Sequence, residues 1–129
     1  MSKIELSRPT DAELSILRVL WQQGESTVRQ VFEALSRGRE VGYTTVLKLM
    51  QIMTEKDLVE RDESERTHVY RARLTQEQTQ RQLVGDLLDK AFGGSASQLV
   101  LQALSAKPAS AKELKRIRQL LDELEGGKR

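Results

Sequence analysis

Apolar residues recur at helical spacing in three consecutive segments of the first half of the chain. The first segment follows a capping box, in which Thr10 and Glu13 each satisfy a free amide at a helix start, and it ends at Gly24. Ser26 or Thr27 caps the second segment, and a third follows it. The positions that we expect to face a common core are Leu14, Leu17, Val19, Leu20 and Trp21 in the first helix, Val28, Val31, Phe32 and Leu35 in the second, and Val46, Leu49, Met50 and Met53 in the third.

Two short strand patterns follow these helices, over residues 58–61 and 68–73. The segment between them, residues 62–67, is entirely polar, which predicts a β-hairpin with a charged tip. Three helices followed by a hairpin is the order of a winged helix, in which the third helix enters the major groove and the hairpin forms the wing. We therefore predict a winged-helix DNA-binding domain over residues 1–74.

The pattern changes after Leu74, where strand signals give way to three further helical segments. Gly93-Gly94 ends the first of them, residues 95–106 form the second, and a capping box of Ser110 and Glu113 opens the third. The expected fold is mainly α with a small β-hairpin. An N-terminal winged helix-turn-helix is followed by a three-helix dimerisation region over residues 75–129.

The apolar positions of this second region indicate that it packs against a partner. In the last helix they repeat at the spacing of a coiled-coil seam, and one aromatic side chain in residues 75–129 is too few for a stable independent core. We predict a homodimer whose contacts are Leu83, Leu87, Leu88, Phe92, Leu99, Leu114, Ile117, Leu121 and Leu124. The alternative is a helical bundle packed on its own N-terminal domain.

The composition excludes most catalytic and metal chemistry. The 129 residues include no cysteine and one histidine, His68, which excludes disulfides, a cysteine nucleophile and a zinc site built from several nitrogen or sulfur ligands. The sequence has no glycine-rich phosphate loop, and its acidic residues lie in runs typical of solvated faces. We therefore predict that the protein is not an enzyme and uses no cofactor or metal.

The sequence also bears on where the protein resides. No apolar run approaches the roughly 20 residues that span a bilayer, and residues 1–5 lack the apolar core of a signal peptide. The lack of cysteine fits a reducing compartment. We expect a cytoplasmic protein that does not insert into a membrane.

Bulk charge gives little support for a polyanionic partner. The net charge is +2, from 21 basic and 19 acidic side chains, and residues 1–74 hold 12 of each. If this part of the chain binds DNA, the positions of its charges must provide the attraction.

The start of the third helix, at Tyr43 or Thr44, offers groups suited to DNA. Hydroxyls there can reach phosphate oxygens, a lysine and an amide one turn apart can reach base edges, and a leucine can meet a thymine methyl. These expected DNA contacts are Thr44, Thr45, Leu47, Lys48 and Gln51.

The predicted wing adds basic side chains. Arg66 lies at its tip with Arg71 and Arg73 behind it, and these side chains could neutralise phosphates or enter a minor groove. The alternative is that these arginines are solvated and balance nearby glutamates. We interpret His68 as a satisfied wing residue rather than a pH sensor.

Several motifs along the chain resemble those of the penicillinase repressors, the family that includes the beta-lactamase and methicillin-resistance repressors. The resemblance covers nearly the whole chain. It rests on Glu13-Leu14-Ser15-Ile16-Leu17 with Trp21, Thr27-Val28-Arg29-Gln30-Val31, Gly42-Tyr43-Thr44-Thr45-Val46, Lys56-Asp57-Leu58-Val59, Arg66-Thr67-His68-Val69-Tyr70, and Phe92-Gly93-Gly94-Ser95 before Leu99-Val100-Leu101.

The resemblance implies a dimeric winged-helix repressor with interlocked C-terminal helices, bound to an inverted-repeat operator in its own promoter region. It also implies which residues meet the DNA, namely Thr44, Thr45, Lys48 and Gln51 with Arg66 and His68 on the wing. In the beta-lactam members a membrane sensor protease triggers cleavage of the repressor. The corresponding position here is Gln102-Ala103.

The chain departs from the family pattern at four places. The family's scissile Asn-Phe pair is absent at residues 102–103. Ile52 stands where relatives usually have arginine, and Asp57 replaces a common glycine, so operator preference is expected to differ. The cysteine-rich tail of the copper-responsive members is also absent.

A second hypothesis assumes the same fold but no sequence-specific DNA binding. In it the winged helix is a scaffold for protein interactions, and the seam of the last helix docks a different protein. The balanced charge of residues 1–74 is its main support. Steep salt dependence of DNA binding would distinguish the repressor from this scaffold, because bound lysines and arginines displace counterions.

Overall fold

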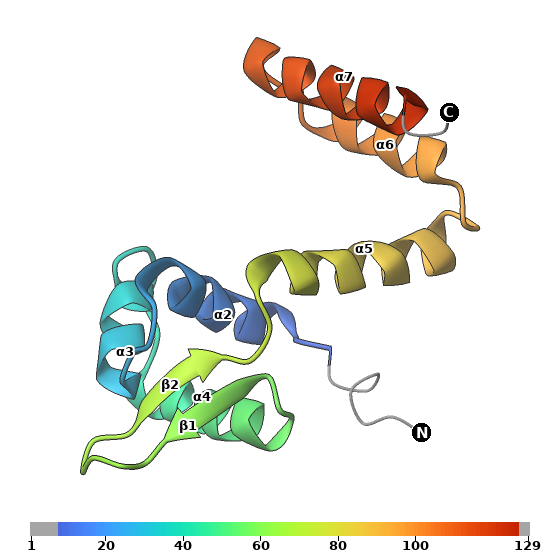
Figure 1. Ribbon diagram of the computed structural model, residues 1–129. Coiled ribbons are helices and arrows are strands. Elements are labelled where there is room, and N and C mark those ends of the chain that lie inside the picture. Colours follow the sequence, from blue (N-terminus) through green and yellow to red (C-terminus); the bar gives the residue numbers. More distant parts are fainter. Residues whose placement is uncertain (1–7, 127–129) are drawn as a thin grey trace. The chain divides into compact units, whose positions relative to one another are not determined.

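The computed structural model describes residues 8–126, and the segments 1–7 and 127–129 lie outside the described residues, including residues 1–5 considered above. Within the described range the chain folds into six α-helices and one β-hairpin (Figure 1). In chain order they are α2 (Asp11–Gln23), α3 (Val28–Ser36), α4 (Tyr43–Glu55), β1 (Val59–Asp62), β2 (Val69–Ala72), α5 (Gln76–Ala91), α6 (Ala96–Ala106) and α7 (Ala111–Gly126). The mainly helical fold with a small hairpin is as predicted.

The chain divides into two compact units inside α5, between Leu83 and Val84. We call the part up to Leu83 the N-terminal unit and the part from Val84 the C-terminal unit. The division falls later than Leu74, the end of the predicted DNA-binding domain, because the first turns of α5 belong to the N-terminal unit. Thr79 of α5 is buried there.

The helix ends of the N-terminal unit follow the capping rules. In α2 the Glu13 amide donates to the Thr10 hydroxyl at 3.2 Å, and the Thr10 amide donates to the Glu13 carboxylate at 2.9 Å. Of the two residues proposed to cap the next helix, Thr27 does so, in a reciprocal pair with Gln30. Gly24 ends α2 with a φ of 84°, which favours a residue without a side chain.

The core of the N-terminal unit draws on all three of its first helices and on the hairpin. Its buried members are Ile16, Leu17, Val19, Leu20, Val28, Val31, Val46, Met50, Met53, Leu58, Val59 and Tyr70. Several residues predicted to lie in this core pack at its edge instead and are only partly buried, namely Leu14, Trp21, Phe32, Leu35 and Leu49. Trp21 lies there because its indole N–H needs an acceptor, and it donates to the Leu74 carbonyl at 3.0 Å.

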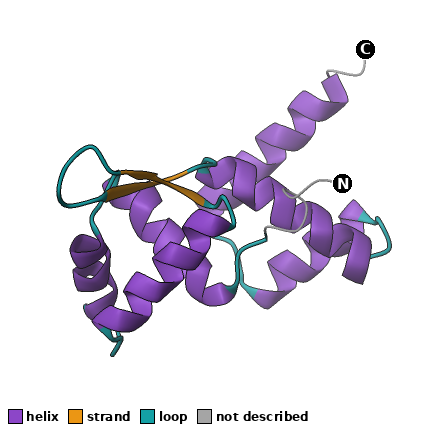
Figure 2. Cartoon of the chain, turned by 90° about the horizontal axis from the view of Figure 1, so that it is seen from below, coloured by secondary structure: helices purple, strands orange, loops and turns teal. Residues whose placement is uncertain are grey.

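The hairpin is antiparallel and pairs Val59 with Ala72 and Asp62 with Val69. The first strand begins and ends one residue later than predicted, and the second is one residue shorter at each end. Leu58, the predicted first residue of the hairpin, bonds to both sides of it. Its amide donates to the Met53 carbonyl, continuing from α4, while its carbonyl accepts from the Arg73 amide. Residues 63–68, one position later than the predicted polar segment 62–67, form the loop at one end of the two strands (Figure 2).

A short bridge attaches the hairpin to the helices. The amides and carbonyls of Ser26 and Tyr70 exchange two hydrogen bonds, of 3.0 and 2.8 Å. The free edge of β2 is thereby paired with the α2–α3 connection, and β1 packs on α4. The wing and the third helix are therefore held to one core, as a winged helix requires.

One ion pair with a buried carboxylate connects α4 to α2. The Lys56 ammonium lies 2.7 Å from a carboxylate oxygen of Glu13, whose side chain is only 3% exposed. Lys56 caps the C-terminal end of α4, whereas Glu13 lies in the first turn of α2. The pair therefore joins the end of the third helix to the start of the first.

The C-terminal unit has no core of its own. None of the residues 84–126 is buried in the single chain, although its helices are well capped at Ser95 and Ser110. Its large exposed apolar side chains are Val84, Leu87, Val100, Leu101, Leu120, Leu121 and Leu124. No helix in the described part of the chain is both long and apolar enough to cross a membrane.

Candidate nucleic-acid interface

One face of α4 is polar and exposed. Thr44, Thr45, Lys48 and Gln51 are all exposed, while Val46, Met50 and Met53 on the opposite face are buried. The residues at 44, 48 and 51 recur at helical spacing and share one face. The structure thus brings together four of the five residues expected to contact DNA from this helix. The fifth, Leu47, is half-buried and packs against the core.

The start of α4 is capped differently from the other helices. Among the described helices, α2, α3, α5, α6 and α7 each begin at a Ser or Thr whose hydroxyl accepts a hydrogen bond from a backbone amide. In α4 the cap is Gly42, which makes no side-chain hydrogen bond. The first amides of α4 therefore remain available to an acceptor from outside the chain, at the positive end of the helix dipole.

A groove runs beside this helix start and joins it to the wing. It has a volume of about 190 Å³, and its lining residues are Thr27, Val28, Arg29, Tyr43, Leu47, Arg66, Thr67, His68 and Tyr70. Three of the predicted DNA contacts, Leu47, Arg66 and His68, thus line one groove. Two basic side chains and no acidic one line it, so the groove suits a polyanion in spite of the balanced charge of this part of the chain.

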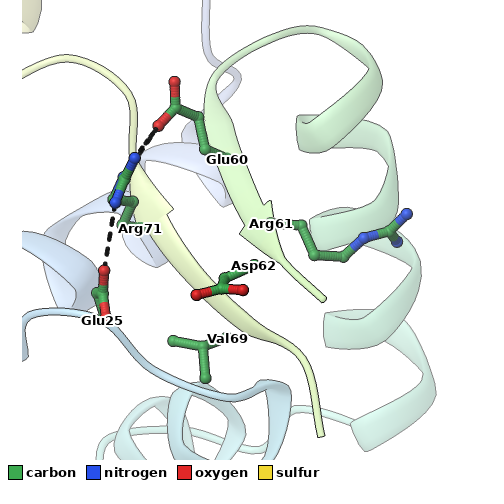
Figure 3. A pocket seen from close by; sticks show the side chains of 6 residues that line it. All are labelled: Glu25, Glu60, Arg61, Asp62, Val69 and Arg71. Carbon is green, nitrogen blue, oxygen red and sulfur yellow. Dashed lines mark hydrogen bonds and ion pairs between the residues drawn. The ribbon is translucent and has the colours of Figure 1, made fainter. Parts of the chain in front are cut away.

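On a second face of the wing, the arginines are already paired within the protein. Arg71 lies between two carboxylates, 2.8 Å from Glu60 and 3.5 Å from Glu25 (Figure 3). These carboxylates, Glu60 first, raise the pKa of Arg71. For Arg71 the sequence-based expectation of a phosphate contact is therefore replaced by the alternative, an arginine that balances nearby glutamates.

The same face contains a polar cleft of about 270 Å³ lined by Glu25, Glu60, Arg61, Asp62, Val69 and Arg71. Figure 3 shows Arg61 pointing away from Arg71. Arg61 pairs with Glu63 at 2.6 Å, and the Tyr70 hydroxyl and Glu63 raise its pKa. The Ser64 amide donates to Asp62 at 2.9 Å and lowers the pKa of that carboxyl. These contacts order the base of the wing tip and leave Arg66 as the basic residue of the tip that faces the groove.

The structure adds two groove residues that the sequence analysis did not assign, Arg29 and Tyr43. The Arg29 guanidinium carbon lies 4.9 Å from the centre of the Tyr43 ring and 5.8 Å from that of Phe32. The only sequence signal was the spacing of Arg29 and Phe32, which places both on one face of a helix. Their contact with Tyr43 joins α3 to α4 and could not be predicted from local pattern.

Three helices with a core-bound hairpin, and a third helix whose exposed face is polar, define a winged-helix protein. The penicillinase repressor family model matches residues 9–123, so the chain belongs to the penicillinase repressor family. This is a family of regulatory repressors and not of enzymes, as predicted.

Relatives agree with this family assignment, and a solved structure matches the fold. The chain is 34% identical over 124 residues to the transcriptional regulator BlaI of Mycobacterium tuberculosis, covering 95% of this chain and 89% of that protein. It is 20% identical to a penicillinase repressor of Staphylococcus aureus, covering 88% of this chain and 90% of the relative. The solved complex of hsRosR-S1 matches the fold with a TM-score of 0.51 at 21% identity, over 99% of this chain and 100% of that one.

Proposed function

We propose that the protein is a transcriptional repressor that binds an inverted-repeat operator as a homodimer, one winged helix to each half-site. The observation that carries this proposal is the exposed polar face of α4 beside a groove with two basic side chains and no acidic ones. An α-helix with such a face fits the major groove of B-DNA, where base edges present hydrogen-bonding groups.

Each candidate side chain has a distinct role in this proposal. Thr44 and Thr45, next to the uncapped amides of α4, bind phosphate oxygens. Lys48 and Gln51 hydrogen-bond base edges one helical turn apart, and Leu47 meets a thymine methyl from the rim of the groove. Arg66 and His68 of the wing meet the flanking backbone.

The C-terminal unit supports the dimer. Of the residues proposed as contacts, Leu87, Leu121 and Leu124 are 48–57% exposed in the single chain, and Leu83, Leu88, Phe92, Leu99, Leu114 and Ile117 are half-buried. Each leucine that a second copy buries fully contributes roughly 1.5–3 kcal/mol. A partner chain would complete the core that residues 84–126 lack by themselves.

The charges of α7 indicate how a second copy would pair. Its first half contains four basic residues, Lys112, Lys115, Arg116 and Arg118, against one acidic residue, Glu113. Its second half contains the acidic residues Asp122, Glu123 and Glu125. Two copies of α7 in antiparallel orientation place each basic half against an acidic half. A parallel pair would juxtapose like charges, which disfavours association.

The proposed location and control of the protein rest on the family resemblance. We place the protein in the cytoplasm and include a membrane sensor protease, or its signalling pathway, among its partners. The position equivalent to the family's cleavage site, Gln102-Ala103, lies within α6 with both side chains exposed. Incubating the purified protein with extracts of induced cells, followed by mass spectrometry, would reveal cleavage there.

A gel-shift titration tests the proposed DNA binding. The purified protein is titrated against the DNA upstream of its own gene, with a scrambled duplex as competitor and with salt varied. We expect a shift that survives the competitor and weakens steeply with salt. Equal binding to both duplexes at every salt concentration would contradict the operator proposal and favour the interaction scaffold.

A substitution on the exposed polar face of α4 sharpens this test. Lys48→Ala removes a base contact from an exposed position, so we expect it to reduce operator affinity by roughly tenfold while leaving the unfolding midpoint unchanged. Arg18→Ala, which removes a charge from the exposed face of α2 and not from α4 or the groove, is the matched control. Equal affinities of the two variants would remove Lys48 from the interface.

A further inference from the structure

Arg29 occupies a distinctive position at the start of α3. It is exposed and lies in the first turn after the Thr27 cap. Its guanidinium carbon is 4.9 Å from the centre of the Tyr43 ring and 5.8 Å from that of Phe32. The two rings meet edge to face, with centres 5.6 Å apart and planes at 77°. Two aromatic side chains from two helices thus hold one exposed cation.

This mode of support leaves the hydrogen-bonding capacity of Arg29 unused. The guanidinium groups of Arg71 and Arg61 on the hairpin donate to carboxylates at 2.6–2.8 Å. Arg29 has no carboxylate within ion-pair distance among residues 8–126. A cation over a ring face is attracted electrostatically and does not consume its N–H donors, so the guanidinium is positioned while its five donors stay available.

The surroundings of Arg29 indicate which ligand would use those donors. Arg29 and Arg66 line the same groove, which has no acidic lining residue, and Tyr43 is the first residue of α4. The guanidinium therefore lies beside the start of α4 and not on the exposed polar face of that helix, where Lys48 and Gln51 lie. A planar fork of N–H donors matches phosphate oxygens, which flank the major groove.

We propose that Arg29, positioned by the Tyr43 ring, binds a backbone phosphate of the DNA beside the start of α4. This inference rests on the proposed function and adds a contact from α3 that acts independently of base sequence. Tyr43 is a positioning residue in this arrangement, since 38% of it remains exposed and its ring serves as the platform for Arg29.

Removal of the guanidinium gives the first test. Each phosphate contact that a protein loses lowers the slope of log affinity against log salt by about 0.9. We expect Arg29→Ala to lower the slope by about this amount and to weaken binding to operator and scrambled duplexes by the same factor, roughly tenfold at low salt. Arg29→Lys should retain the slope because it retains the charge. Arg18→Ala, an exposed arginine of α2 that does not line the groove, is the matched control.

The aromatic platform gives the second test. Tyr43→Phe retains the ring and is expected to bind as the wild type does. Tyr43→Leu retains an apolar contact for Phe32 but loses the ring face, and we expect a loss of about threefold that disappears when Arg29 is already alanine. Circular dichroism of each variant verifies that the fold is retained.

Two results would overturn the proposal while leaving operator binding in place. A salt slope for Arg29→Ala equal to that of Arg18→Ala would show that Arg29 contacts no phosphate. A larger loss on operator than on scrambled DNA would show that Arg29 reads bases. Failure of the wild-type protein to prefer its operator would instead overturn the proposed function, so the two failures are distinguishable.

Discussion

The two units of this chain differ in where their stability can come from. The N-terminal unit buries twelve apolar residues around Ile16, Val31 and Met50 and joins its parts with a buried ion pair and a β-bridge. Residues 84–126 form helices that also carry apolar side chains at helical spacing, yet none of these residues is buried in the single chain. Similar apolar periodicity thus produces a self-contained core in one case and a surface suited to a second copy in the other.

The largest expected effect comes from a charge placed on that surface. In a dimer, Leu121→Asp would bury one unpaired carboxylate from each copy, which costs several kcal/mol. We expect the variant to be monomeric and to lose more than about 100-fold in operator affinity, because two linked half-sites are no longer bound together. Sedimentation velocity provides the oligomeric state, and Gln119→Asp, an exposed position of α7 outside the seam, is the control. A dimeric Leu121→Asp protein would show that the seam is misassigned.

Truncation of a side chain in the N-terminal core should lower the stability of the protein without affecting dimerisation. Met50 is fully buried, so Met50→Ala is expected to reduce the free energy of unfolding by about 2–5 kcal/mol. Urea denaturation measures this loss. The dimerisation constant of folded Met50→Ala should equal that of the wild type. A weaker dimer would show that the two units are not independent.

The buried ion pair should contribute less. Lys56→Met leaves the Glu13 carboxylate buried without its cation, although Lys56 itself is 28% exposed and water can partly compensate. We expect a loss of about 1–3 kcal/mol in urea denaturation, against less than about 0.5 kcal/mol for the exposed neighbour Glu55→Gln. Equal stabilities of the two variants would mean that the pair does not hold α2 to α4.

Substitution of Asp57 should produce a small gain in stability. Asp57 has a φ of 62°, the left-handed region that side chains disfavour. Asp57→Gly is expected to raise the free energy of unfolding by about 0.5 kcal/mol, since the relief of strain is partly offset by the entropy of the unfolded chain. Asp57→Ala should be destabilising at the same position. Thermal melts rank the stabilities of the wild type, Asp57→Gly and Asp57→Ala. A glycine variant less stable than the wild type would show that Asp57 is not strained.

Local sequence signals predicted most of the fold, for reasons that the structure makes clear. Capping boxes at Thr10 and Ser110 and the helix stop at Gly24 involve neighbours in the chain, so their pattern determines their geometry. The wing was predicted from its polar tip between two strand patterns. Its exact bounds depend on Leu58, which bonds both to α4 and to Arg73, and no local rule predicts that.

The candidate site was predictable only in part. The face of α4 with Thr44, Lys48 and Gln51 follows from helical periodicity. The contact of Arg29 with Tyr43 and the pairing of Arg71 with Glu25 join residues from different elements. Long-range contacts of this kind depend on how the elements pack, so charge counts along the chain did not distinguish the paired arginine from the available one.

In the proposed function, two copies of this chain bind one operator through their winged helices. Sedimentation of the protein with a labelled duplex from its own upstream region tests this claim directly, because the mass of the complex gives the number of chains bound. We predict two chains per duplex, with a dimer already present in the absence of DNA. A complex with a single chain, or a protein that remains monomeric and unbound at micromolar concentration, would rule out a dimeric repressor.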